Sequence, residues 1–131
     1  MTPTDLAIRE TPARYADALD RQDPTALAEV LTEDATWTFS IDGAPGPGPF
    51  FGRPAILDFV RDAAPTPADR RRHHLTTVVV ERAGSATAAV RAHLLLTSGT
   101  GLVATGSYTF RLRRTGDEWR IAELFLEMNN R

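Results

Sequence analysis

The second half of the chain consists of four strand-length segments separated by glycine turns, and this pattern limits the fold more than any other feature. The segments cover roughly residues 73–82, 86–98, 101–114 and 118–128. The turns between them contain Gly84, Gly99-Thr100-Gly101 and Gly116-Asp117. Links this short join antiparallel neighbours. We therefore predict an antiparallel sheet from the C-terminal half.

The first half carries three helix starts in which proline occupies the first turn. They are Thr11-Pro12, Asp23-Pro24 and Arg53-Pro54. Apolar residues at helical spacing follow each start, namely Tyr15, Ala16 and Leu19, then Leu27, Val30 and Leu31, then Ile56, Phe59 and Val60. A short preceding helix would hold Leu6 and Ile8.

The remaining N-terminal segments are one strand and two loops. Residues 35–41 (ATWTFSI) are expected to form a strand, and residues 65–70 a loop. Residues 43–52 contain too much proline for a central strand. Helices that come first and a meander that comes last favour an α+β fold with the helices on one face of the sheet. At 131 residues we expect a single domain over 1–131.

Two strands carry apolar residues on both of their faces. Val90, Ala92, Leu94 and Leu96 alternate with Leu95. In the last strand Ala122, Leu124, Leu126 and Met128 are expected on one face, and Trp119, Ile121 and Phe125 on the other. A sheet that is apolar on both faces must have both faces covered, and three helices can cover only one of them. We therefore predict a homodimer through the outer face of the sheet.

Composition excludes several kinds of chemistry. The chain has no cysteine, so thiolate and disulfide chemistry are absent, and all 15 basic residues are arginine, so no lysine can form a Schiff base. The net charge of −2 and the short Arg70–Arg72 patch, read as a solvated loop before a strand, argue against nucleic acid. No signal peptide or membrane-spanning run is evident, so we expect a cytoplasmic protein. Abundant Ala, Arg, Pro and Gly suggests a bacterial source.

Four segments in order resemble the SnoaL-like branch of the nuclear transport factor 2-like superfamily. They are ARYADALDRQDPTALAEVLTEDATW, FFGRPAILDFV, RHHLTTVVVE, where Thr77 stands in place of the usual Asn, and GSYTFRLRRTGDEWRI. The resemblance implies a cone-shaped α+β barrel in which three N-terminal helices pack on a strongly curved, mostly antiparallel sheet around an apolar pocket. The fold serves dehydratases, isomerases, cyclases, epoxide hydrolases and plain binders, so it does not by itself assign a function.

Asp20 and His73 are the leading candidates for catalysis. They are similar in position to an Asp–His pair of dehydratases of this fold. A carboxylate can fix the tautomer of an imidazole and raise its basicity, and the imidazole can then move a proton next to a carbonyl or a leaving hydroxyl. The structural alternative is that Asp20 ends a helix and that His73 is a core histidine with a satisfied hydrogen bond.

Tyr15 and Tyr108 resemble positions that carry oxyanion donors in isomerases of this fold. Two phenols could hold a substrate oxygen, or could pack as ordinary aromatic residues. Phe39 stands where those isomerases have their general-base Asp, which makes that mechanism improbable. Arg111 and Arg113 alternate to the opposite face from Tyr108, so no Asp–Arg–Asp set of epoxide hydrolases can be assembled.

An apolar wall should surround these polar groups. We predict substrate contacts from Trp37, Phe39, Leu75, Thr77, Leu94, Leu96, Phe110, Leu124, Leu126 and Met128, although each could serve only as core. His74 and His93 alternate away from the face of His73. With three histidines on differing faces we expect no metal site and no cofactor.

Two functions from different classes follow. The first is a cofactor-independent dehydratase, isomerase or cyclase that acts on a small hydrophobic oxygenated molecule through the Asp20–His73 pair. The second is a non-catalytic module, either a small-molecule binder or a dimeric structural unit. A third and weaker reading is an interaction domain whose pocket its own side chains fill.

Overall fold

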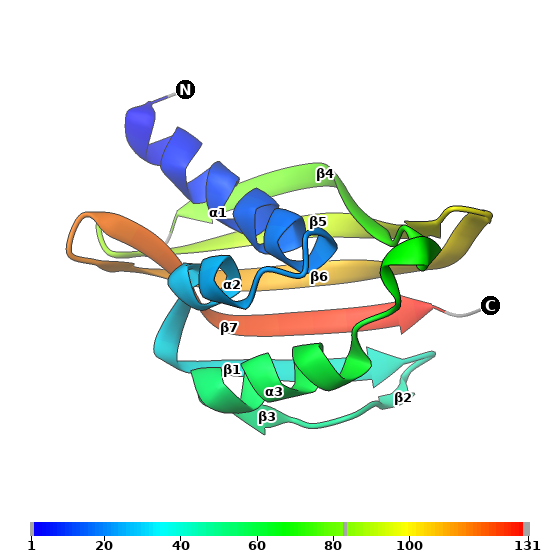
Figure 1. Cartoon of the computed structure of the whole chain (residues 1–131). Coiled ribbons are helices and arrows are strands. Elements are labelled where there is room, and N and C mark those ends of the chain that lie inside the picture. Colours follow the sequence, from blue (N-terminus) through cyan, green and yellow to red (C-terminus); the bar gives the residue numbers. More distant parts are fainter. Residues whose placement is uncertain (1, 83, 130–131) are drawn as a thin grey trace.

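The computed structural model describes residues 2–82 and 84–129, which form three α-helices, a short 3₁₀ helix and seven strands (Figure 1). The helices are α1 (Pro3–Asp20), α2 (Pro24–Val30), α3 (Arg53–Ala63) and the 3₁₀ helix η1 (Pro67–Asp69). The strands are β1 (Leu31–Ile41), β2 (Ala44–Pro45), β3 (Phe50–Phe51), β4 (Arg72–Arg82), β5 (Thr87–Ser98), β6 (Gly101–Thr115) and β7 (Glu118–Asn129).

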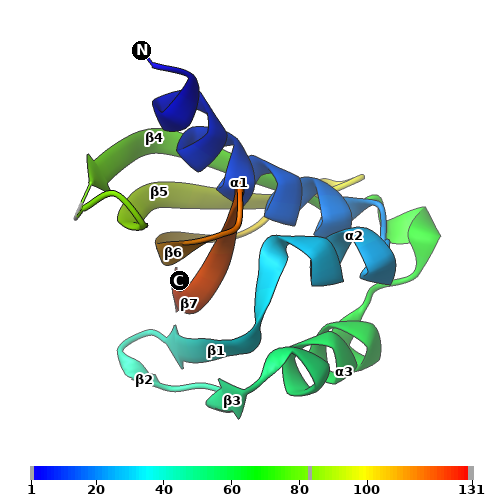
Figure 2. The same cartoon turned by 90° about the vertical axis from the view of Figure 1, so that its left-hand side faces the viewer.

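All seven strands belong to one curved sheet with the order β2-β1-β7-β6-β5-β4, and β3 pairs with β1. Only β1 and β7 run parallel; every other pairing is antiparallel. The sheet bends around α1 and α2 without closing, and α3 lies beside β1 (Figure 2). The predicted α+β architecture, with three helices on one face of a mostly antiparallel sheet, is confirmed.

The first helix begins nine residues earlier than the proline signal predicted, so the prediction of a separate short helix before it is wrong. Thr2 caps α1: its hydroxyl accepts from the backbone N–H of Asp5, and the Asp5 carboxylate accepts from the backbone of Thr2. Pro12 lies inside the helix and is buried, and it removes one backbone donor. The Thr11 hydroxyl donates to the carbonyl of Ala7 at 2.9 Å instead of capping a new helix. Packing therefore overrides the local signal.

A β-bulge in β7 overturns the predicted division of its faces. The register against β6 shifts between the pairs Arg111↔Glu123 and Leu112↔Ile121, so Ala122 is the extra residue. Alternation therefore breaks there, and Trp119 and Ile121 lie in the core together with Leu124. The prediction that Trp119 and Ile121 face outward was wrong, because a one-residue insertion moves every preceding side chain to the other face.

The first strand is also longer than predicted. β1 starts at Leu31, which was assigned to the second helix, and the strand is interrupted by a register shift before Thr36. The proline-rich segment 43–52 is not wholly a loop, since β2 and β3 pair with β1 in two short stretches. Within residues 2–82 and 84–129, no helix is both long and apolar enough to cross a membrane.

Candidate functional site

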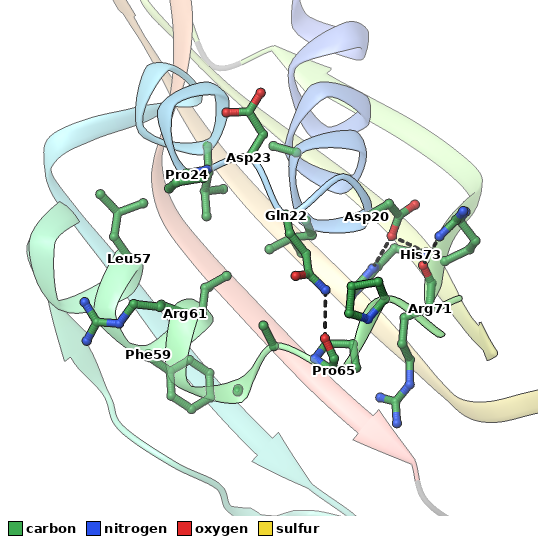
Figure 3. A pocket seen from close by; sticks show the side chains of 18 of the residues that line it. Asp20, Gln22, Asp23, Pro24, Leu57, Phe59, Arg61, Pro65, Arg71 and His73 are labelled. Atoms are coloured by element: carbon green, nitrogen blue, oxygen red, sulfur yellow. Dashed lines mark hydrogen bonds and ion pairs between the residues drawn. The ribbon is translucent and has the colours of Figure 1, made fainter. Parts of the chain in front are cut away.

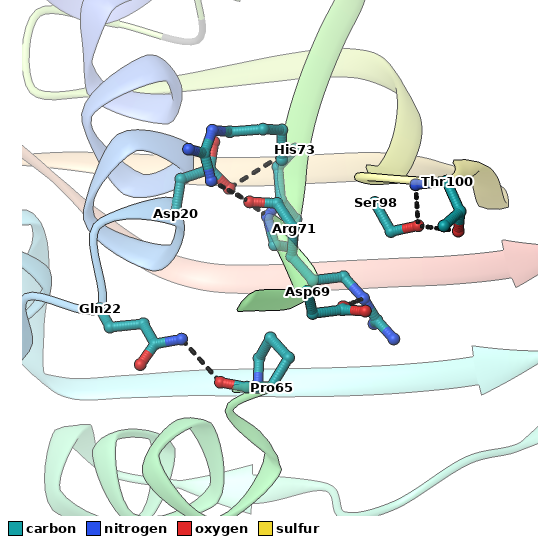
Figure 4. A network of polar contacts seen from close by, with 9 residues as sticks. Asp20, Gln22, Pro65, Asp69, Arg71, His73, Ser98 and Thr100 are labelled. Carbon is teal, nitrogen blue, oxygen red and sulfur yellow. Dashed lines mark hydrogen bonds and ion pairs between the residues drawn. The ribbon is translucent and has the colours of Figure 1, made fainter. Parts of the chain in front are cut away.

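The end of α1 and the start of β4 bring Asp20 and His73 together. Asp20 is the last residue of α1 and His73 the second residue of β4. The Asp20 Oδ1 accepts from the backbone N–H of His73 at 2.9 Å and contacts the ring Nδ1 at 2.8 Å (Figure 4). A carboxylate can only accept, so Nδ1 carries the proton and a neutral ring keeps Nε2 as its acceptor. Among the described residues Nε2 has no hydrogen-bond partner.

The turn between α1 and α2 fixes the position of the carboxylate. The backbone N–H of Arg21 caps α1 by donating to the carbonyls of Asp17 and Leu19. Gln22 then adopts a left-handed backbone with φ of 50°, and Asp23 caps α2 by accepting from the backbone of Ala26 at 3.0 Å. With both helix ends capped within three residues, Asp20 is held at a rigid corner.

The pair lies at the wall of a cavity of about 590 Å³ (Figure 3). The cavity is bounded by the ends of α1 and α2, by α3, by the segment that links α3 to β4, and by inward residues of β1 and β5. Its apolar wall includes Ala18, Leu19, Leu27, Trp37, Leu57, Phe59, Val60 and Leu96. Its polar groups are Asp20, Gln22, Asp23, Asp58, Arg61, Thr66, Arg70, Arg71, Arg72 and His73. This volume suits a small organic ligand.

His73 keeps most of its surface away from water while still lining the cavity. Its side chain is 19% exposed and that of Asp20 16%. His73 pairs across the sheet with Leu96, which lines the same cavity. An imidazole in such surroundings has an apolar neighbour on one side and a hydrogen-bonded carboxylate on the other. Chemically, the arrangement can accept a proton at Nε2 and stabilise the resulting charge through Asp20.

Tyr15 and Tyr108 meet in the core and do not line the cavity. Their hydroxyls are 3.3 Å apart, and their side chains are 0% and 2% exposed. Both rings pack on Phe110, at centroid distances of 5.6 and 4.8 Å. Burial raises the pKa of both phenols well above the usual value, and the negative charge of Asp20 raises the pKa of Tyr108 further. Both hydroxyls therefore stay protonated at neutral pH.

Of the ten predicted wall residues, the structure places two at the cavity. Trp37 and Leu96 line it. The others do not line it, and they fall into three groups. Leu94, Phe110, Leu124, Leu126 and Met128 are buried core residues, Phe39 and Leu75 are half-buried, and Thr77 is exposed. The cavity lies toward the helices, because side chains of the curved sheet fill the centre of the cone themselves.

Thr77 is exposed because β4 contains a bulge. The register against β5 shifts between Thr76 and Val79, and Thr77 has a left-handed backbone with φ of 52°. Alternation from His73 through Leu75 is therefore broken before Val78. His74 and His93 are exposed, as their alternation predicted.

Sequence reasoning missed the wall formed by α3 and the segment that follows it. Leu57, Phe59 and Val60 face the cavity and remain only half-buried, whereas Ile56 of the same helix is fully buried. The partial signal was the apolar face of α3, which was interpreted as core alone. Gln22 Nε2 donates to the carbonyl of Pro65 at 2.9 Å, and this bond ties the segment to the end of α1 (Figures 3 and 4).

A metal site has no support among residues 2–82 and 84–129, where no three His, Asp or Glu side chains converge. One buried donor at the wall does lack a partner: Trp37 Nε1 has no hydrogen bond within this part of the chain. Its ring has aromatic neighbours: the ring centroid of Phe59 lies 5.3 Å away in an edge-on arrangement, and that of Phe50 lies 6.4 Å away.

Comparison with known proteins gives a family but no assigned activity. No curated protein matches the chain. Among solved structures, Rv3472 of Mycobacterium tuberculosis, a protein of unknown function, is 29% identical with a TM-score of 0.76, over 98% of this chain and 76% of that one. An NTF2-like protein with a cystatin-like fold from Novosphingobium aromaticivorans is 26% identical with a TM-score of 0.75, over 95% and 80%.

A third structure carries an enzyme name. The hexachlorocyclohexane dehydrochlorinase LinA-type3 of Novosphingobium barchaimii is 21% identical with a TM-score of 0.77, over 95% of this chain and 86% of that one, which is a likeness of fold. The sequence profile of the SnoaL-like domain matches residues 2–124, nearly the whole chain. Together with the curved sheet and its three helices, this match shows that the chain belongs to the SnoaL-like domain family.

Proposed function

We propose that the chain is a cofactor-independent acid–base enzyme that removes a proton from a small hydrophobic oxygenated molecule held in the cavity. The observation that carries the proposal is the Asp20–His73 pair, hydrogen-bonded at 2.8 Å, at the wall of an apolar cavity of about 590 Å³. The fold is shared with a dehydrochlorinase, whose name describes an elimination. That likeness makes proton abstraction from carbon a natural class of reaction for this fold.

The proposed step moves one proton. His73 Nε2 takes a proton from a carbon next to a carbonyl or to a carbon bearing a leaving group, and Asp20 stabilises the imidazolium that forms. In an elimination the electron pair of the broken C–H bond forms the new C=C bond while the leaving group departs with the electron pair of its own bond. In an isomerisation or cyclisation the electrons form an enolate, and the proton returns to another atom or the enolate carbon attacks an electrophile.

The tyrosines enter this proposal in a supporting role. Tyr15 and Tyr108 are buried and absent from the cavity wall, so they are placed to support the core beside Asp20 rather than to hold the substrate oxygen. Their hydroxyls share one hydrogen bond at 3.3 Å, in which one hydroxyl donates to the other.

The test uses a nitrobenzisoxazole, a general probe of bases in apolar sites, because removal of its single acidic C–H opens the ring to a coloured phenolate. We expect His73→Ala to lower the rate by about 10²–10⁴-fold, the typical contribution of a positioned base. His74→Ala is the matched control, since His74 is the adjacent exposed histidine, bonded to Thr97 at 2.9 Å. A His73→Ala protein within a few-fold of the wild type would remove the base from the mechanism.

The second candidate is a binder without chemistry. It is favoured because Asp20 and His73 are the one hydrogen-bonded carboxylate–imidazole pair among the described lining residues. A hydrophobic probe that stabilises the protein in a thermal scan, with no probe consumed over hours at any pH, would support the binder over the enzyme.

We also propose that two copies associate through the outer face of the sheet. That face is less apolar than predicted, because the bulge moved Trp119 and Ile121 inside, yet Leu95, Val103 and Phe125 remain 40%, 42% and 36% exposed. We expect a dimer by light scattering, and a monomer for Phe125→Glu, since a buried unpaired charge is costly at an interface. A wild-type monomer at high concentration would contradict this proposal.

A further inference from the structure

The segment that follows α3 lines the cavity but has little packing to hold it in place. We call residues 63–67, with the sequence AAPTP, the strap. All five residues line the cavity, yet four are exposed and Pro65 is only half-buried. A segment with so few buried contacts opens at a lower free energy than the core beside it. The position of the strap therefore depends on a few individual contacts.

Both ends of the strap are anchored. On the side of α3, the Phe59 ring stacks on Phe50 with 4.4 Å between the ring centroids and meets Trp37 edge-on at 5.3 Å. On the side of β4, the backbone N–H of Gly99 donates to the carbonyl of Asp69 at 2.9 Å, which ties η1 to the turn between β5 and β6. The strap is a short bridge between these two fixed points.

One hydrogen bond joins the middle of the strap to the opposite side of the cavity. Gln22 Nε2 donates to the carbonyl of Pro65 at 2.9 Å. Within residues 2–82 and 84–129, no other hydrogen bond or ion pair connects the strap with the turn between α1 and α2. Pro65 and Pro67 have no N–H and a fixed φ, so they restrict bending within the strap. When the Gln22 bond breaks, the strap can therefore move as a short stiff piece between its anchors.

This bond lies at the mouth of the cavity. Gln22 is exposed, whereas the side chains of Asp20 and His73, which also line the cavity, are only 16% and 19% exposed. Figure 3 shows the bond between Leu57 and Phe59 of α3 on one side and His73 on the other. A broad ligand that enters to contact both α3 and the imidazole therefore meets this bond on its way in.

The backbone around Gln22 keeps its side chain at a defined place. Gln22 has a φ of 50°, a left-handed conformation that is uncommon for residues other than Gly, Asn and Asp. On one side the backbone N–H of Arg21 caps α1, and on the other the Asp23 side chain caps α2. Such conformations tend to occur at ligand sites, where the surrounding structure imposes them.

We propose that Gln22 determines the size of the molecules that enter the cavity, because its bond to Pro65 narrows the mouth and has to break before a broad ligand passes. A narrow ligand enters with the bond intact. The inference rests on the proposed function only for the cavity being the ligand site, and it does not depend on the proton transfer. Gln22 acts on entry, without contact to the reacting atoms.

The experiment follows the entry of two neutral aromatic alcohols that differ in width, the narrow 2-anthracenemethanol and the broad 1-pyrenemethanol. Excitation of tryptophan transfers energy to either probe as it arrives beside Trp37, so that a stopped-flow instrument records association and dissociation. The variants are Gln22→Asn and Gln22→Gly, since both residues accept the left-handed backbone and neither side chain is long enough to reach Pro65.

Arg21→Ala is the matched control. Arg21 lies in the same turn and pairs with Asp17 at 3.4 Å and Asp23 at 3.9 Å, but it does not line the cavity. A general loosening of the turn would therefore appear in this variant as well.

We expect the wild type to take up anthracenemethanol faster than pyrenemethanol. Both Gln22 variants should raise the association rate of pyrenemethanol by about 3–10-fold, which corresponds to the loss of one hydrogen bond. Its dissociation rate should rise by the same factor, so that Kd stays within about twofold. Neither anthracenemethanol with the Gln22 variants nor either probe with Arg21→Ala should show such a change.

Several outcomes would overturn the inference. Equal acceleration of both probes would show that the substitutions loosen the whole cavity instead of widening its mouth. Pyrenemethanol association that is unchanged in both variants would show that the bond does not restrict entry. A change in Kd with an unchanged association rate would make Gln22 a binding contact. A wild type that binds neither probe, or takes up both equally fast, would also contradict it.

The ring-opening assay separates this inference from the proposed function. A wild type that never opens the nitrobenzisoxazole ring, but whose uptake of pyrenemethanol depends on Gln22, would overturn the enzyme and leave the size limit standing. Ring opening that depends on His73, together with probe entry that is indifferent to Gln22, would do the reverse.

Discussion

Removing the hydroxyl of Tyr15 or Tyr108 tests what the buried phenol pair contributes. The two hydroxyls contact each other at 3.3 Å, and their side chains are 0% and 2% exposed. Tyr15→Phe therefore leaves the Tyr108 hydroxyl buried without this partner, and Tyr108→Phe does the same to Tyr15. A buried polar group without a partner costs about 1–3 kcal/mol. We expect each single variant to lower the free energy of unfolding by about 1–2 kcal/mol.

The double variant gives the sharper result. With both hydroxyls gone no donor is left unsatisfied, and replacement of both partners by apolar groups can be nearly neutral. We expect the double variant to be less destabilised than the sum of the singles by about 1 kcal/mol or more. Neither the singles nor the double should change the nitrobenzisoxazole rate more than a few-fold, since neither ring lines the cavity.

Urea unfolding followed by circular dichroism supplies the free energies, provided that all four proteins show the same dependence on denaturant. Additive losses would show that the hydroxyls do not depend on each other. A large loss of rate with little loss of stability would refute the supporting role and return the tyrosines to the substrate. Tyr108→Phe is the more informative single, because the charge of Asp20 acts on Tyr108.

Two further predictions concern stability. Burial raises the pKa of Tyr15 and Tyr108 above the usual value near 10, so the unfolded chain releases these protons first. Below about pH 10 the two tyrosines add no pH dependence to the free energy of unfolding. Above that pH the free energy of unfolding should fall by up to about 1.4 kcal/mol per pH unit for each tyrosine. Urea midpoints that decline equally in the double Phe variant would contradict this. Thr77→Asn should stabilise the protein by about 1 kcal/mol, because Asn accepts the φ of 52° that a β-branched residue resists. The control Thr76→Asn should give no such gain. An unchanged melting temperature for Thr77→Asn would contradict strain at this position.

The sequence determined the class of this fold through local rules. Glycine turns and strand-length apolar segments specified four antiparallel strands, and Asp23-Pro24 and Arg53-Pro54 specified two helix starts that the structure retains. Resemblance to the SnoaL-like family also identified Asp20 and His73, which lie 53 residues apart in the chain. Hydrophobic periodicity could not have predicted that these two residues are in contact, because the contact depends on where α1 ends relative to β4.

Only the tertiary structure decided which side chains face the cavity. The bulges at Thr77 and Ala122 invert the alternation of β4 and β7, and a bulge cannot be read from a period of two, because it is itself a departure from that period. α1 continues through the buried Pro12, a residue type that commonly interrupts helices.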